Sequence, residues 1–81
     1  MTILLFGVTR DIVGNGSLSI PLGKAAGLKT VYELKKYLGE IYPPLEELSS
    51  LAVAVNKAYA RDEDPITNFD EIALIPPVSG G

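Results

Sequence analysis

The sequence predicts a two-layer α+β domain in which one main helix packs on one face of a mixed β-sheet. Two observations predict this class. One long amphipathic segment, residues 31–42, lies in the middle of the chain, and apolar strand-like segments flank it on both sides. Because the apolar stripe of a helix and the apolar face of a sheet both need cover, packing one on the other buries both. With 81 residues, the chain is expected to form one small domain.

The segment before the main helix is expected to supply two antiparallel strands. Residues 2–8 form the first predicted strand, and residues 8–13 a short helical turn with Thr9 as its N-cap. After a glycine-rich turn, residues 17–22 alternate between apolar and polar side chains, which is typical of a half-buried strand. Pro21 lacks a backbone donor, so this strand is expected at an edge of the sheet.

Residues 23–27 are expected to form a loop. The loop contains a Gly-Lys pair, which raises the question of a phosphate-binding loop. The motif fails at two positions, because Leu18 replaces its first glycine and Ala25 replaces the Ser or Thr that follows the lysine. The sequence therefore predicts no nucleotide site here.

The main helix carries its own start and stop signals. Thr30 and Glu33 form a capping box, in which each side chain is expected to accept from the other residue's amide. Prolines at residues 43–44 end the helix at about residue 42. Spacings of three, four and three lay one apolar stripe along the helix, which is expected to face the core. The stripe consists of Val31, Leu34, Leu38 and Ile41.

The segment after the helix is expected to complete the sheet. A short helical turn is predicted first, followed by a buried strand, a tight turn, a short strand, an acidic loop and a last strand near the centre of the sheet. These elements are assigned to residues 44–49, 51–56, 56–57, 58–60, 61–65 and 71–75 respectively.

The composition excludes most catalytic chemistry. The chain has no histidine and no cysteine, which removes the commonest neutral-pH base, thiolate nucleophiles and most transition-metal sites. Its formal net charge of −3 and scattered basic residues argue against nucleic-acid binding. The acidic cluster at residues 62–64 lacks the ligand spacing of a calcium loop, so no metal site is expected. No signal peptide or membrane span is recognised, and the cytoplasm is the expected compartment.

The C-terminus is the distinctive chemical feature that remains. Gly80 and Gly81 end the chain in a carboxylate without bulky neighbours, and a Gly-Gly segment can enter a narrow channel. Prolines at residues 76–77 favour an extended stem that would aim this carboxylate away from the sheet. The alternative is a frayed end without a role, which is common at chain termini.

The residues Leu-Ile-Pro-Pro-Val-Ser-Gly-Gly at 74–81 resemble the terminal signature of the MoaD-like sulfur carriers, the small subunits of molybdopterin synthase. The resemblance implies the ubiquitin-like β-grasp fold, with a domain at residues 1–76 and a tail at residues 77–81. One departure is Asn68-Phe69, because the family more often has a glycine before the aspartate. Other shared features are Leu5-Phe6-Gly7 followed by Arg10, the Thr30 helix, Ala54-Val55-Asn56 and Asp70-Glu71.

The resemblance implies a sulfur-transfer cycle. An adenylating enzyme uses ATP to activate the Gly81 carboxylate, and a sulfur donor system converts it to a thiocarboxylate. The tail then enters the large catalytic subunit and donates sulfur to cyclic pyranopterin monophosphate, within a heterotetramer. The chain itself would bind no permanent cofactor and would supply no acid–base group. Tail insertion would use Pro77, Val78, Ser79 and Gly80.

The same resemblance places the docking surface on the sheet near the tail. Phe6 and Ile75 are candidates for an exposed apolar patch there, with Arg10 as a flanking contact; core packing is the alternative for the two apolar residues. Gly-Gly alone also fits a thiamin-pathway sulfur carrier, a ubiquitin-like modifier that forms isopeptide bonds through Gly81, or an interaction domain whose tail has no role.

Overall fold

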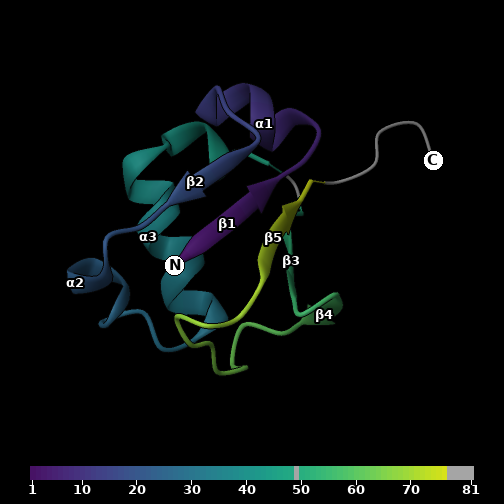
Figure 1. Ribbon diagram of the computed structural model, residues 1–81. Coiled ribbons are helices and arrows are strands. Elements are labelled where there is room, and N and C mark those ends of the chain that lie inside the picture. Colours follow the sequence, from purple (N-terminus) through teal and green to yellow (C-terminus); the bar gives the residue numbers. More distant parts are fainter. Residues whose placement is uncertain (49, 77–81) are drawn as a thin grey trace.

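The computed structural model describes residues 1–48 and 50–76. Within these residues one five-stranded sheet has the strand order β2-β1-β5-β3-β4 (Figure 1). The strands are β1 (Thr2–Leu5), β2 (Ser17–Ser19), β3 (Ala52–Val55), β4 (Ala58–Ala60) and β5 (Ile72–Ile75). The helices are α1 (Val8–Val13), α2 (Leu22–Ala25), α3 (Val31–Ile41) and the 3₁₀ helix η1 (Pro43–Leu45).

The sheet is mixed, and the predicted central position of the last strand is confirmed. β5 runs parallel to β1 and antiparallel to β3, while β2 and β4 pair antiparallel with their neighbours at the two edges. Helix α3 packs behind this sheet, so the two-layer α+β class is confirmed (Figure 1). A crossover between the parallel strands β1 and β5 carries α3, as parallel pairing requires.

Strand pairing places two different rows of side chains on the two faces of the sheet. Ile3 pairs with Ile72, which pairs with Val55, and this row faces the helix. Leu5 and Val53 both pair with Leu74, and these three side chains are buried in the core. Because side chains alternate along a strand, the residues between them project from the opposite, open face.

Helix α3 begins as predicted, but its capping box differs in one hydrogen bond. The Glu33 amide donates to Thr30 Oγ1 at 3.2 Å, which confirms the N-cap. The Glu33 carboxylate accepts from the Lys29 amide and from the Thr30 hydroxyl instead of the Thr30 amide. The first three residues of the predicted stripe are buried, but Ile41 is 47% exposed. The helix ends at Ile41, before its side chain can reach the core.

Three other local predictions are wrong. Thr9 does not cap α1: Gly7 occupies the N-cap position, and Thr9 is buried with its hydroxyl bonded to the backbone of Phe6. Residues 23–27 do not form a plain loop, since α2 extends from Leu22 to Ala25, and the amides of Lys24 and Ala25 donate to the Pro21 carbonyl. The strands before the helix are also shorter than predicted, because β1 ends at Leu5 and β2 at Ser19.

The turn at Asn56-Lys57 is confirmed, and it joins β3 to β4. Both residues have positive φ, 53° and 70°, as the turn of a two-residue hairpin requires. Asn56 also accepts from the Glu71 amide and donates to the Asp70 carboxylate, so the hairpin is bonded to the start of β5. These hydrogen bonds hold the β3–β4 hairpin next to the residues that lead into β5.

Candidate functional site

The chain leaves the centre of the sheet beside the end of β1. Because β1 and β5 are parallel, both end at the same edge, and Gly7 lies against Pro76 there. A Cβ on Gly7 would lie 2.9 Å from Cγ of Pro76, and Gly7 has a φ of 55° that glycine adopts readily. The described chain therefore ends at Pro76, next to the central strand of the sheet. The predicted tail residues Pro77, Val78, Ser79, Gly80 and Gly81 lie outside the described residues.

The open face of the sheet contains a shallow groove of about 280 Å³. One row across four strands forms its floor, because Leu4 pairs with Ala73, Ala73 with Ala54, and Ala54 with Tyr59. The complete lining is Leu4, Phe6, Ala54, Lys57, Tyr59, Glu71, Ala73 and Ile75. Small alanines in the floor and aromatic side chains at the margins make the groove apolar and accessible.

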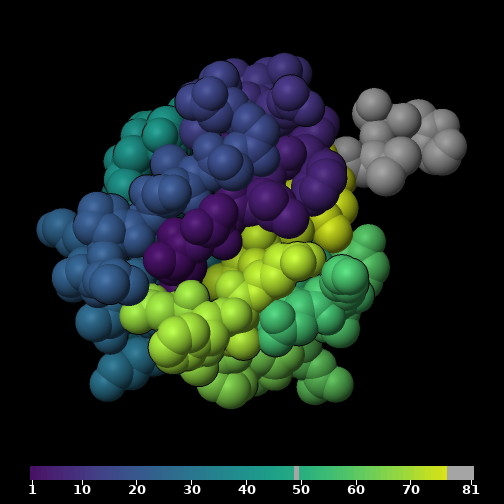
Figure 2. Space-filling view, in the orientation of Figure 1, coloured from purple at the N-terminus to yellow at the C-terminus, as the bar shows by residue number. Residues whose placement is uncertain are grey.

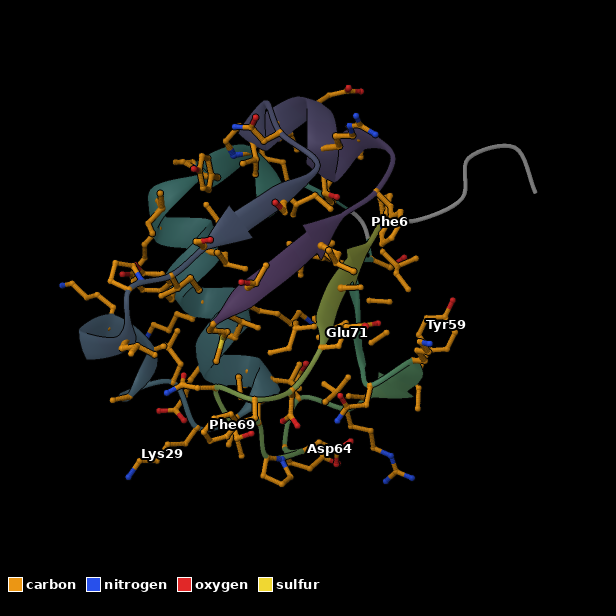
Figure 3. All side chains as sticks on the ribbon, in the orientation of Figure 1. Phe6, Lys29, Tyr59, Asp64, Phe69 and Glu71 are labelled. Carbon is orange, nitrogen blue, oxygen red and sulfur yellow. The ribbon has the colours of Figure 1, made fainter. Side chains whose placement is uncertain are left out.

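The structure brings two of the three predicted docking residues together. Phe6 is 50% exposed and Ile75 is half-buried, and both line the groove beside the start of the tail (Figure 3). Arg10 does not line it; this side chain extends from α1 over Gly16, where a Cβ would lie 3.7 Å from its Cζ. Phe6 and Ile75 therefore lie in one exposed groove, as the predicted apolar patch requires, whereas Arg10 lies apart from them.

Sequence reasoning missed Tyr59 as a member of this groove. Tyr59 is 74% exposed on the edge strand β4, and Figure 3 shows it on the margin of the sheet. The sequence did contain a signal. Tyr59 stands between two alanines just after the hairpin turn, so it alone would place a large side chain on its face of this short strand. Its pairing with Ala54 decides that the side chain faces the groove.

The charged groups of the groove lie at the end away from the tail. Lys57 and Glu71 line that end, next to the Asn56 hydrogen bonds. Beside them, the Asn56 amide donates to Asp70 Oδ1 at 3.0 Å, and the Thr67 amide donates to Asp70 Oδ2 at 2.8 Å. These donors, Asn56 first, lower the pKa of Asp70 below its ordinary value of 3.8, because they stabilise the carboxylate.

A second cavity, of about 630 Å³, lies on the helix side of the molecule. Its lining includes Tyr32, Leu45 and Leu51, and the ion pair between Lys35 and Asp62 at 3.0 Å. Within residues 1–48 and 50–76, no group of three acidic side chains is placed to hold a metal. No helix in the same part of the chain is long and apolar enough to span a membrane.

The chain belongs to the ThiS family, whose sequence profile matches residues 3–81. Within that family it is 39% identical to the molybdopterin synthase sulfur carrier subunit of Dictyostelium discoideum, over 98% of this chain and 93% of the relative. The match therefore includes both the described domain and the Gly-Gly end, and the family resemblance of the last eight residues is confirmed.

Two solved structures are similar over nearly the whole chain. One is the complex of subunits 1 and 2 of the molybdopterin-converting factor from Helicobacter pylori, at 26% identity, a TM-score of 0.62 and coverage of 99% of this chain and 96% of that chain. The other is the small archaeal modifier protein 1 of Haloferax volcanii, at 25% identity, a TM-score of 0.75 and coverage of 99% and 97%. The β-grasp fold is thereby confirmed.

Proposed function

We propose that this chain is the sulfur carrier subunit of a molybdopterin synthase and that the Gly81 carboxylate carries the sulfur. The observation that carries the proposal is the 39% identity, over 98% of this chain, to a relative of that name. The central position of β5, the strand that precedes the tail, supports it. No histidine or cysteine is present, so the terminal carboxylate is the group best suited to bear a transferable sulfur.

The chemistry begins with activation, because a carboxylate is a poor acyl donor. Attack of the Gly81 carboxylate on the α-phosphorus of ATP forms an acyl-adenylate and releases pyrophosphate. The outer sulfur of a persulfide on the donor system then attacks the acyl carbon, and AMP leaves. A second thiol of the donor system attacks the inner sulfur of the resulting acyl disulfide, so that a disulfide forms on the donor and the thiocarboxylate leaves. An adenylating enzyme is the partner that this step requires. Because the step consumes ATP, we place it in the cytoplasm.

The thiocarboxylate then reacts inside the large catalytic subunit. Its sulfur is a soft nucleophile that attacks an electrophilic carbon of the cyclic pyranopterin monophosphate and displaces an oxygen leaving group, which gives a thioester. Water then cleaves the acyl–sulfur bond, so that the sulfur stays on the pterin and the Gly81 carboxylate is returned. The two glycines fit a narrow channel in which the reacting atoms are held close. The partner supplies the acid–base groups, and this chain supplies a rigidly based tail and a docking face.

The groove on the open face is the surface that fits the large subunit. Phe6 and Ile75 lie beside the start of the tail, and Tyr59 extends the apolar surface to the sheet edge. An aromatic residue in a partner pocket can supply much of the binding energy. The H. pylori relative in complex with its second subunit supports a partner of this kind.

Mass spectrometry tests the proposal directly. The chain is co-expressed with an adenylating enzyme and its sulfur donor, with a variant lacking Gly81 as the control. The expected product is heavier than the free chain by the exchange of one oxygen for one sulfur, and only when Gly81 is present. This product must then convert the pterin precursor in single turnover with the large subunit.

Other outcomes of the same experiment would contradict the proposal. Conjugates to lysines of other proteins, without thiocarboxylate, would favour a modifier like the archaeal neighbour. Sulfur delivery to thiazole synthesis, with no conversion of the pterin precursor, would favour a thiamin-pathway carrier. An unmodified chain would leave an interaction domain whose tail has no role.

A further inference from the structure

Phe69 is the most exposed large hydrophobic side chain of the described residues, at 97%. A phenylalanine in this state contributes nothing to the core, and full exposure leaves its whole apolar surface in water. Leu22, at 68%, is exposed on the separate helix α2. Phe69 therefore offers a single large apolar group to a partner without any rearrangement of the fold.

The turn that carries Phe69 is held by several hydrogen bonds. The Asp70 amide donates to the Thr67 carbonyl at 3.2 Å, and the Phe69 amide donates to Thr67 Oγ1 at 3.3 Å. The Asp70 carboxylate accepts from the Thr67 amide and from Asn56 of the hairpin. The backbone of Phe69 does not have a positive φ, so the turn accepts phenylalanine without strain. A turn whose backbone is already held in place loses little backbone entropy on binding.

Phe69 lies at the end of the sheet opposite the tail. It comes just before Glu71, which lines the charged end of the groove, whereas Phe6 and Ile75 line the other end (Figure 3). In Figure 2 the segment before β5 forms the lower margin of the same view in which β1 and β5 are exposed. Ile75 follows Phe69 by six positions, of which β5 supplies the last four, so the two residues are separated by at most about 20 Å. An interface of ordinary size covers such a span.

We propose that Phe69 is a second anchor for the large catalytic subunit, at the end of the open face away from the tail. The inference rests on the proposed function. A partner that receives the tail and covers the groove reaches Phe69 by continuing along the same face. The large subunit is the chosen occupant because a solved structure similar to this chain, at 26% identity, is a complex of subunits 1 and 2 of the molybdopterin-converting factor.

The test measures binding of the thiocarboxylated chain to the isolated large subunit by titration calorimetry. Phe69→Ala is compared with Leu22→Ala, a matched removal of an exposed apolar side chain from α2. Phe69→Ala is expected to weaken binding by about ten- to a hundredfold, since a buried aromatic anchor contributes that much. Leu22→Ala is expected to bind like the wild type. Both variants should shift the thermal midpoint by no more than about 4 °C.

A second readout separates docking from chemistry. At saturating large subunit, single-turnover sulfur transfer by Phe69→Ala should match the wild type, because Phe69 lies far from Gly81 along the sheet. Unchanged affinity of Phe69→Ala for the large subunit would overturn the inference. So would a loss confined to the adenylating enzyme, or a change in self-association of the chain. If the wild-type chain fails to bind the large subunit, the proposed function fails, and this inference fails with it.

Discussion

The two faces of the sheet are built by the same strands but have different chemistry. On the helix side, Leu5, Val53 and Leu74 are buried in the same core cluster as the apolar residues of α3. On the open side, the row through Ala73 and Ala54 is small and apolar, and aromatic residues stand at its margins. The helix side therefore stabilises the domain, whereas the open side is apolar and exposed in the described residues. Apolar surface that the fold leaves exposed is the kind that a partner covers.

Removal of Gly81 is expected to have the largest effect on function and almost none on stability. The deletion should abolish thiocarboxylate formation and sulfur transfer. The terminal carboxylate would then belong to Gly80, on a tail one residue shorter, and would no longer reach the reacting groups of the partners. The thermal midpoint should not change, since the core residues described here all precede Ile75. Calorimetric melting and single-turnover transfer measure the two effects. A clear loss of stability in this variant would contradict the separation of roles.

Two neighbouring residues of β5 test the faces directly. Leu74→Ala should lower the free energy of unfolding by about 2–5 kcal/mol, because it leaves a cavity in the core. Ile75→Ala, one position along and on the open face, should cost about 1 kcal/mol or less in stability. Instead it should weaken binding to the large subunit. Urea unfolding and binding titrations give both values; equal stability losses would mean that the faces do not differ.

Tyr59 and Tyr32 form a matched pair of exposed tyrosines on opposite sides of the domain. Tyr59→Ala should weaken binding to the large subunit by about tenfold, which corresponds to 1.4 kcal/mol, because the side chain lines the groove. Tyr32→Ala on α3 should leave that affinity unchanged. Both variants should remain folded by circular dichroism. A larger effect of Tyr32→Ala would move the docking surface to the helix side.

The smallest expected effect concerns acid stability at the far end of the groove. The folded pKa of Asp70 is lowered, so its carboxylate stabilises the fold above about pH 4, and that contribution is lost as the pH falls through the lowered pKa. Asp70→Asn should therefore be less stable than wild type at pH 7, and the gap should narrow at pH 2–3. The exposed Asp11→Asn is the control. Urea unfolding at each pH measures the difference in free energy of unfolding between the variant and the wild type. A difference that does not change with pH would contradict the prediction.

Much of the architecture could be predicted from local patterns. The Thr30 cap, the Pro43 stop and the Asn56-Lys57 turn depend on nearby residues, and each was found where the sequence indicates. Thr9 was mispredicted because its hydroxyl is drawn inward to the Phe6 backbone, a contact that depends on how β1 enters α1. The exposure of Ile41 follows from the place where the helix leaves the core, which periodicity alone does not specify.

The sequence by itself determined that the terminal carboxylate is the chemical group of interest, because a chain without histidine and cysteine offers few others. It also determined where the main helix begins and ends, since caps and prolines act over a few residues. Only the tertiary structure decided that Phe6, Tyr59 and Ile75 share one groove and that Arg10 lies apart. Those positions depend on the pairing of β1 with β5, strands nearly a whole chain apart, and a register shift of one residue would exchange the faces.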